Sequence, residues 1–115
     1  MKYHTIEIDG TEYNFRLTSQ DAIKIEENCK VKLLDYITDY SMTAIVNLLY
    51  FMRRGAEQGF TKQEAYEFFD ELADHDWALE DIIKKIILPT AKVSGLLKKS
   101  DLTKIDEAMD QATQN

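Results

Sequence analysis

The sequence has few of the residues that build covalent or metal-bound frameworks. Among its 115 residues are one cysteine, Cys29, one proline, Pro89, four glycines and two histidines. With a single cysteine the chain can form no internal disulfide, and a metal cage built from cysteines is excluded. We therefore expect a protein of a reducing compartment, with Cys29 packed as a small core residue.

Long apolar runs and a positive net charge are also absent. The longest apolar run, residues 45–52, is interrupted by Asn47 and is too short to cross a bilayer. The N-terminus carries no apolar signal region. The net charge of −7 argues against nucleic-acid binding, since a protein that contacts the phosphate backbone needs a cationic face. We expect neither a membrane nor a nucleic-acid partner, and favour a basic or apolar one.

Motifs that carry catalysis or bind metals are missing as well. His4 and His75 do not stand in a metal-ligand spacing, and the single glycines form no phosphate-binding loop. Asp74 and Asp76 begin like a calcium loop, but Trp77 follows where the loop needs an oxygen ligand. We therefore predict no enzymatic activity, no metal and no cofactor.

Charge segregation is the main feature that the sequence does have. Residues 64–81 contain eight carboxylates and no lysine or arginine, whereas residues 82–104 contain six lysines and one acid. Such blocks can neutralise each other within a subunit or between subunits, which predicts self-association. The acidic face of the predicted helix consists of Glu64, Glu67, Asp70, Glu71 and Asp74. The basic block includes Lys84, Lys85, Lys92, Lys98 and Lys99. The acidic face is either a solvated surface or a docking surface for a basic partner.

The hydrophobic pattern predicts an α+β fold that is mainly α, with an N-terminal β-hairpin packed on a bundle of about five helices. Residues 3–17 alternate as two strands around Asp9-Gly10, a dipeptide typical of a tight hairpin turn. Helical patterns then begin near Thr18, Leu33, Ser41, Thr61, Leu79 and Ser100. The helix from Ser41 is apolar all round its axis, and we interpret it as the centre of the core in preference to an oligomer contact.

These patterns divide the chain into two segments. We expect residues 1–99 to form the hairpin and helical domain, and residues 100–115 to form an amphipathic helix with a frayed polar tail. Pro89 predicts a kink or a break in the helix before it, because proline lacks a backbone donor. Apolar residues near helix ends and breaks are candidate partner contacts, although a core role is the favoured interpretation for most of them. These candidates are Phe60, Tyr66, Trp77, Leu96 and Leu97.

Two stretches carry a resemblance to a known family. The first is "IEIDGTEYNFRLT" at residues 6–18, and the second is "GFTKQEAYEFFDELADHDWALEDIIKKIILPTAKVSG" at residues 59–95. Their order and turn residues resemble the small tail assembly chaperones of long-tailed phages and prophages of Gram-positive bacteria. The chain departs from that pattern at residues 76–78, where "GGS" is frequent in the family and this chain has "DWA".

The resemblance implies a non-catalytic protein of the bacterial host cytoplasm. Such chaperones bind the tape measure protein, a long helical chain, and keep it soluble until the tail tube protein polymerises around it. They are often made in a short and a frameshifted long form, and this chain corresponds to the short one. Two alternatives remain at this stage. The chain is an acidic adaptor that binds a host protein through the Glu64–Asp74 helix face, or it is a structural subunit of the tail.

Overall fold

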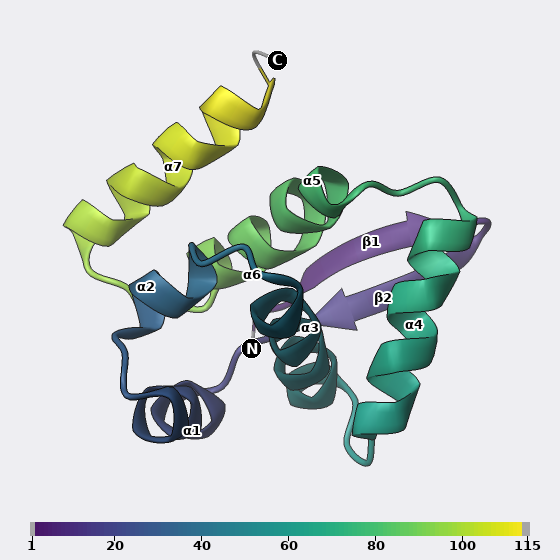
Figure 1. The fold of residues 1–115 in the computed structure, drawn as a ribbon, viewed down its shortest axis with the longest axis horizontal. Coiled ribbons are helices and arrows are strands. Elements are labelled where there is room, and N and C mark those ends of the chain that lie inside the picture. Colours follow the sequence, from purple (N-terminus) through teal and green to yellow (C-terminus); the bar gives the residue numbers. More distant parts are fainter. Residues whose placement is uncertain (1, 114–115) are drawn as a thin grey trace.

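The computed structural model describes the backbone of residues 2–113 and the side chains of residues 2–110. It confirms the predicted α+β, mainly α fold (Figure 1). The elements are, in order, β1 (His4–Ile8), β2 (Thr11–Phe15), α1 (Ser19–Cys29), α2 (Leu33–Ile37), α3 (Met42–Ala56), α4 (Lys62–Asp74), α5 (Leu79–Ile82), the π-helical turn η1 (Ile83–Ile87), α6 (Leu88–Val93) and α7 (Lys99–Thr113). The part of the predicted frayed tail at residues 114–115 lies outside the described residues.

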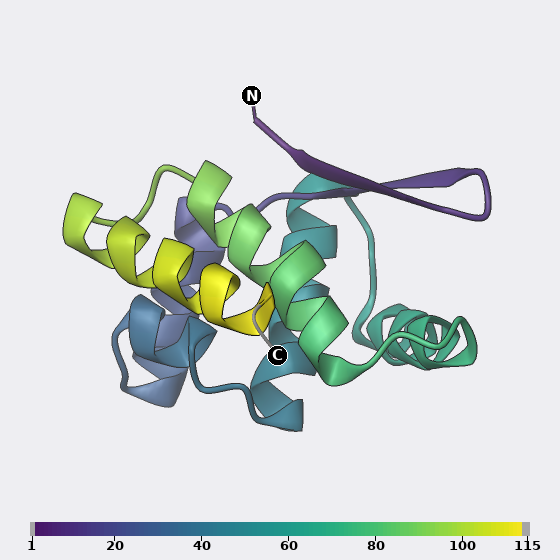
Figure 2. The ribbon, with the colours of Figure 1, turned by 90° about the horizontal axis from the view of Figure 1, so that it is seen from above.

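The N-terminal hairpin forms as its sequence predicts. Strands β1 and β2 pair antiparallel with Ile8 opposite Thr11, and the turn residues Asp9 and Gly10 both have positive φ, 49° and 81°. These angles are those of the turn that matches the twist of a hairpin. Ile8 and Phe15 are buried on the same face of the hairpin. Figure 2 shows the hairpin extending to the same side of the molecule as α4.

Side-chain caps fix the starts of three helices at the predicted positions. The hydroxyl of Thr18 accepts from the backbone N–H of Asp21 at the start of α1, and Ser41 caps α3 in the same way. At the start of α4, Thr61 and Glu64 form both bonds of a capping box. Each cap satisfies backbone donors that the first helical turn leaves without a partner.

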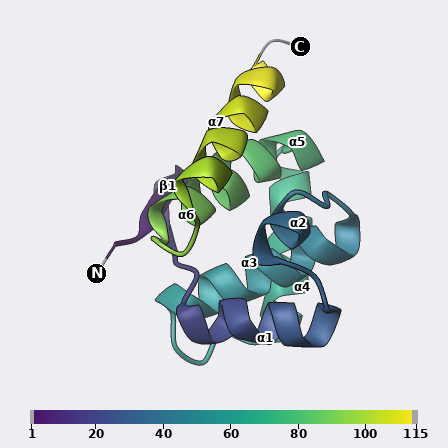
Figure 3. The same ribbon diagram turned by 90° about the vertical axis from the view of Figure 1, so that its left-hand side faces the viewer.

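Helix α3 is the centre of the core, as its apolar pattern indicates. It contacts β2, α2, α4 and η1, and in Figure 1 α1 and α2 lie on one side of it, the side that faces the viewer in Figure 3. Five of its side chains are at most 2% exposed: Ala44, Ile45, Leu48, Leu49 and Met52. Gly55 lets the chain that leaves β2 cross α3 closely. A Cβ atom at this position would lie 2.0 Å from the carbonyl oxygen of Arg16.

Pro89 perturbs its helix without breaking it. The chain is helical from Leu79 to Val93, and the perturbation takes the form of the η1 turn. There the backbone N–H of Leu88 donates to the carbonyl oxygen of Ile83, five residues earlier. This turn, wider than that of an α-helix, comes just before Pro89, which has no N–H for a backbone hydrogen bond within the helix. The helical conformation therefore continues beyond the proline as α6.

The expected core position of Cys29 is wrong, and two further residues that helical spacing places on buried stripes, Leu79 and Ala73, are also exposed. Cys29 is exposed because the last turn of α1, from Glu26 onwards, extends beyond the core. Leu79 is 39% exposed, since it is the first residue of α5 and lies at the edge of the core that Ile82 enters. Ala73 is exposed on the outer side of α4 and does not belong to its buried stripe.

Candidate functional site

An open apolar groove lies between the N-terminal half of α3 and the side of α4 that faces it. Its volume is about 340 Å³. The residues that line this α3–α4 groove are Met42, Thr43, Val46, Asn47, Tyr66, Phe69 and Asp70. Met42 is 58% exposed and Tyr66 is 49% exposed, which are high values for large apolar side chains. Apolar surface that gathers in a hollow is typical of a binding site for another molecule.

The groove exists because the apolar surface of α4 is wider than the core requires. Ala65, Phe68 and Leu72 form the buried stripe of this helix. The next positions around the helix, at 100° per residue, bring Phe69 and Tyr66 to the side that faces the start of α3. Two neighbouring apolar strips thus share one helix, and one of them remains open to solvent.

A polar cluster closes one end of the groove. The side-chain amide of Asn47 donates to the hydroxyl of Tyr36 at 2.9 Å, and its oxygen accepts a hydrogen bond from the ammonium of Lys62. The same ammonium lies 5.3 Å from the ring centre of Tyr50 and 5.9 Å from that of Tyr66. These cation–π contacts and the hydrogen bonds hold the first turn of α4 against α3. Burial raises the pKa of Tyr36, so its hydroxyl remains protonated and keeps this arrangement at neutral pH.

The acidic face of α4 separates into two groups of carboxylates. Glu64 accepts from the backbone N–H and the hydroxyl of Thr61, and so belongs to the helix cap. Glu71 lies beside the hydroxyl of Tyr13 on the hairpin. Burial, followed by the negative charge of Glu71, raises the pKa of that tyrosine. These two acids therefore have structural partners within the chain.

The other three acids of this face share one side of α4 by helical spacing, and one of them, Asp70, lies in the groove. Asp70 lines the groove, and Glu67 and Asp74 stand three residues before it and four residues after it on the same helix. All three are exposed, and none forms an ion pair with a lysine or an arginine within residues 2–110. We call Glu67, Asp70 and Asp74 the acidic rim.

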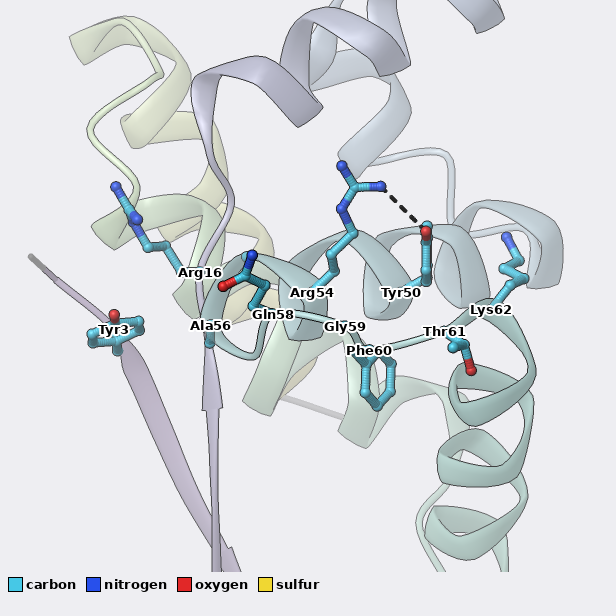
Figure 4. Close-up of a pocket in the computed structure, with 11 residues that line it drawn as sticks. Tyr3, Arg16, Tyr50, Arg54, Ala56, Gln58, Gly59, Phe60, Thr61 and Lys62 are labelled. Atoms are coloured by element: carbon cyan, nitrogen blue, oxygen red, sulfur yellow. Dashed lines mark hydrogen bonds between the residues drawn. The ribbon is translucent and has the colours of Figure 1, made fainter.

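A second hollow, with a volume of about 640 Å³, lies where α3 ends and α4 begins (Figure 4). Arg16, Arg54 and Lys62 line it, but their charges do not converge. Arg54 donates to the hydroxyl of Tyr50 at 3.2 Å and lies 3.4 Å from a carboxylate oxygen of the buried Asp21, an ion-pair contact without hydrogen-bond geometry. The hydrogen bond with Tyr50 and the charge of Asp21 raise the pKa of Arg54. In Figure 4 the side chain of Arg16 points away from Arg54, so the hollow does not concentrate positive charge on one point.

The walls of the α3–α4 groove are held in place by Arg53, a residue that the sequence did not single out. Its side chain is 12% exposed and pairs with Glu57 at 2.6 Å. Its guanidinium carbon lies 4.8 to 5.8 Å from the centres of four aromatic rings, those of Phe60, Tyr13, Phe68 and Phe15. One side chain thereby links β2, α3 and α4. Helical periodicity gave no signal for this role, because the rings come from three separate parts of the sequence: β2, the loop before α4, and α4.

The five apolar residues proposed as partner contacts lie in different parts of the molecule. Tyr66 is in the α3–α4 groove. Phe60 is 8% exposed and stacks on Arg53, and Trp77 is half-buried with the ammonium of Lys85 5.2 Å from its ring. At the connection between α6 and α7, Leu96 is 36% exposed and Leu97 packs half-buried against the core. The structure therefore does not gather these five residues into one site.

The basic block and the acidic face also lie apart. Lys84 and Lys85 are on η1, Lys92 is on α6, and Lys98 and Lys99 are at the start of α7. Lys85 pairs with Asp81 at 3.8 Å and Lys92 pairs with Asp106 at 2.8 Å. Within the described part of the chain, no ion pair joins the basic block to the acidic face. Figure 1 shows α4 and α7 on opposite sides of the molecule, so pairing between the two blocks within one subunit is not seen.

Comparisons with family models, with curated proteins and with solved structures gave no match. Among the residues that the structure describes, no group of three or more His, Cys, Asp and Glu side chains is placed to hold a metal ion. In the same part of the chain, no helix combines the length and the apolar character needed to cross a membrane.

Proposed function

We propose that the protein is a phage tail assembly chaperone, which binds the tape measure protein and keeps it soluble while the tail is assembled. The observation that carries this proposal is the open α3–α4 groove, where Met42 and Tyr66 expose apolar surface that an amphipathic helix can cover. The family resemblance of residues 6–18 and 59–95 supplies the identity of the client. The work is non-catalytic and takes place in the cytoplasm of the bacterial host.

A groove of this size favours weak, reversible binding of the client. A hollow of about 340 Å³ covers only a short stretch of a long client, so each contact is weak. Several copies along one client together cover much apolar surface, because bound neighbours raise the effective concentration for the next contact. The tail tube protein displaces the copies as it polymerises.

Co-expression tests the proposal directly. The protein is produced together with the tape measure protein encoded in the same phage genome, and the soluble fraction and co-purification of the tape measure protein are measured. Expression of the tape measure protein alone is the control. We expect it to be insoluble alone, and soluble and co-eluting in the presence of this chain. An insoluble tape measure protein beside soluble chaperone, with the longer frameshifted form also tested, rules the proposal out.

One structural observation favours a second candidate, the adaptor that binds a host protein. The carboxylates of Glu67, Asp70 and Asp74 have no lysine or arginine partner within residues 2–110, which leaves them available to a basic surface. Under this hypothesis, Glu67→Lys abolishes one host contact and leaves tail assembly unchanged. The third alternative is a structural tail subunit. Under that hypothesis the protein is expected in purified virions.

A further inference from the structure

We infer that the α3–α4 groove receives an amphipathic helix that carries lysines or arginines along one edge, supplied by a different protein chain. The inference deepens the proposed function and rests on it only for the identity of the client. It specifies which segments of a client are recognised: those whose apolar stripe is flanked by basic residues. It follows from the shape of the groove, from the charge of its rim and from what the chain itself offers.

The groove and its acidic rim together have the length of a short helical contact. From Tyr66, which lines the groove, to Asp74 of the rim, helix α4 advances eight residues, or about 12 Å at the rise of an α-helix. Apolar residues at positions i, i+3 or i+4, and i+7 of a bound helix span about the same distance. Met42 and Tyr66 offer exposed apolar contacts, and Val46 and Phe69 form part of the lining between α3 and α4. An amphipathic helix of two to three turns therefore fits this surface.

The rim determines the charge of the occupant. Glu67, Asp70 and Asp74 repel one another at spacings of three and four residues, and the C-terminal end of α4 adds its own partial negative charge near Asp74. Lys62, in the polar cluster at one end of the groove, is engaged by Asn47 and the two tyrosine rings. The open edge of the groove is thus negative. Cations on a bound helix remove the repulsion within the rim, whereas anions increase it.

Within the residues whose side chains the structure describes, a second copy of this chain does not offer such a helix. The amphipathic helix at the surface is α7, and its central apolar residue, Ile105, is fully buried in the core of its own subunit. Between residues 99 and 110 this helix has two lysines and four acids, so the acidic rim repels it. In α5, η1 and α6 the residues Ile82, Ile86 and Ile87 are also buried. The occupant therefore comes from another chain.

Two synthetic helical peptides of about 18 residues test the inference. Both carry leucines at positions i, i+3, i+4 and i+7, and they differ only in lysine or glutamate along the flanks. Binding to the intact protein is measured by fluorescence anisotropy at low and high salt. We expect the lysine peptide to bind at least about tenfold more tightly than the glutamate peptide, with an advantage that falls as salt rises. Equal binding of the two peptides overturns the inference.

Variants locate the binding surface. Met42→Ser and Tyr66→Ala change exposed side chains of the groove, and Ile23→Ser is the matched control because Ile23 is 54% exposed on α1. Circular dichroism verifies that each variant is folded. We expect each groove variant to weaken binding of the lysine peptide by about fivefold or more, with no change for Ile23→Ser. Asp70→Lys is expected to reverse the preference between the two peptides. Unchanged binding by the groove variants, or an equal loss in the control, overturns the inference.

The remaining outcomes separate this inference from the proposed function. If light scattering shows that Met42→Ser converts an oligomer to a monomer, the occupant is a second copy and the inference is wrong. If the lysine peptide binds the groove while the tape measure protein stays insoluble in co-expression, the proposed function fails and the inference holds. If the groove variants keep the tape measure protein soluble as well as the original chain does, the inference fails and the proposed function holds.

Discussion

Nε2 of His4 donates a hydrogen bond of 2.6 Å to the main-chain carbonyl oxygen of Lys85. In a regular α-helix this carbonyl would accept from the N–H of residue 89, but that residue is proline and has no N–H. The first strand of the hairpin thus supplies the donor that the helix lacks. Since a carbonyl oxygen only accepts, the hydrogen bond also requires the tautomer of His4 that carries its proton on Nε2.

This relationship predicts coupling between His4 and Pro89. In the original chain we expect His4→Ala to lower the free energy of unfolding by about 0.5–1.5 kcal/mol. In a Pro89→Ala background the cost should be smaller, because the N–H of residue 89 then competes for the carbonyl of Lys85. Urea unfolding of the two single variants and the double variant measures the difference. Strictly additive costs would show that the two residues act independently.

A second prediction concerns pH and the contact between the hairpin turn and α4. Nε2 of His75 lies 2.7 Å from a carboxylate oxygen of Asp9, and Nδ1 lies 3.0 Å from the carbonyl oxygen of Glu71. Both partners only accept, so the two hydrogen bonds form together only when both ring nitrogens carry protons. The hydrogen bond to Asp9, and then the one to the backbone of Glu71, raises the pKa of His75.

A raised pKa means that the folded state binds the proton more tightly than the unfolded state does. The contribution of His75 to stability is therefore fully present below the unfolded pKa of about 6.5, and it is lost as pH rises through the folded pKa. Asp9→Asn removes the carboxylate and keeps a residue that tolerates positive φ. We expect the original chain to exceed this variant in stability more at about pH 6 than at about pH 9. A constant difference would contradict the assignment.

The third prediction concerns Gly55. Alanine favours a helix over glycine by about 1 kcal/mol, so propensity alone predicts that Gly55→Ala stabilises α3. The structure predicts the opposite, because the new Cβ would lie 2.0 Å from a backbone oxygen of Arg16. We expect a net loss of about 1–3 kcal/mol in urea unfolding. Gly59→Ala is the comparison, since its surroundings are open and only its φ of 89° opposes a side chain. If Gly55→Ala stabilises the protein instead, the backbone at Arg16 can move away from α3 at little cost.

The fourth prediction concerns Arg53. We expect Arg53→Lys to destabilise the protein by about 1–2 kcal/mol although the charge is kept, since an ammonium cannot stack as a planar guanidinium does. Arg16→Lys is the matched control, because no ring contact of Arg16 is found among the described side chains. Thermal unfolding of both variants gives the comparison, and equal melting temperatures would contradict the role of the ring contacts.

The sequence predicted those parts of the fold that depend on local chemistry. The Asp9-Gly10 turn and the Thr61 capping box each involve residues within a few positions of one another, and both form as expected. The core position of α3 was also predictable, because a helix that is apolar all round has few other places to lie. Helical spacing places Ile25 and Cys29 on one face of α1, but only Ile25 is buried, because the helix has left the core by residue 29.

The candidate site was less predictable because it depends on how distant segments meet. Phe69 has the same helical spacing as a core residue, and only the placement of α3 leaves it at the edge of a groove. The division of the acidic face depends on the position of the hairpin, which brings Tyr13 to Glu71. The effect of Pro89 was foreseeable, whereas the donor from His4, 81 residues from Lys85, was not.

The position of Arg53 has a consequence for the thermodynamics of binding at the α3–α4 groove. Because this side chain joins β2, α3 and α4, and because Lys62 ties the first turn of α4 to Asn47, the two walls keep their separation when the groove is empty. A preformed surface loses little conformational entropy on association. The entropy cost of ordering therefore falls on the incoming segment, and segments that are already helical in solution bind best.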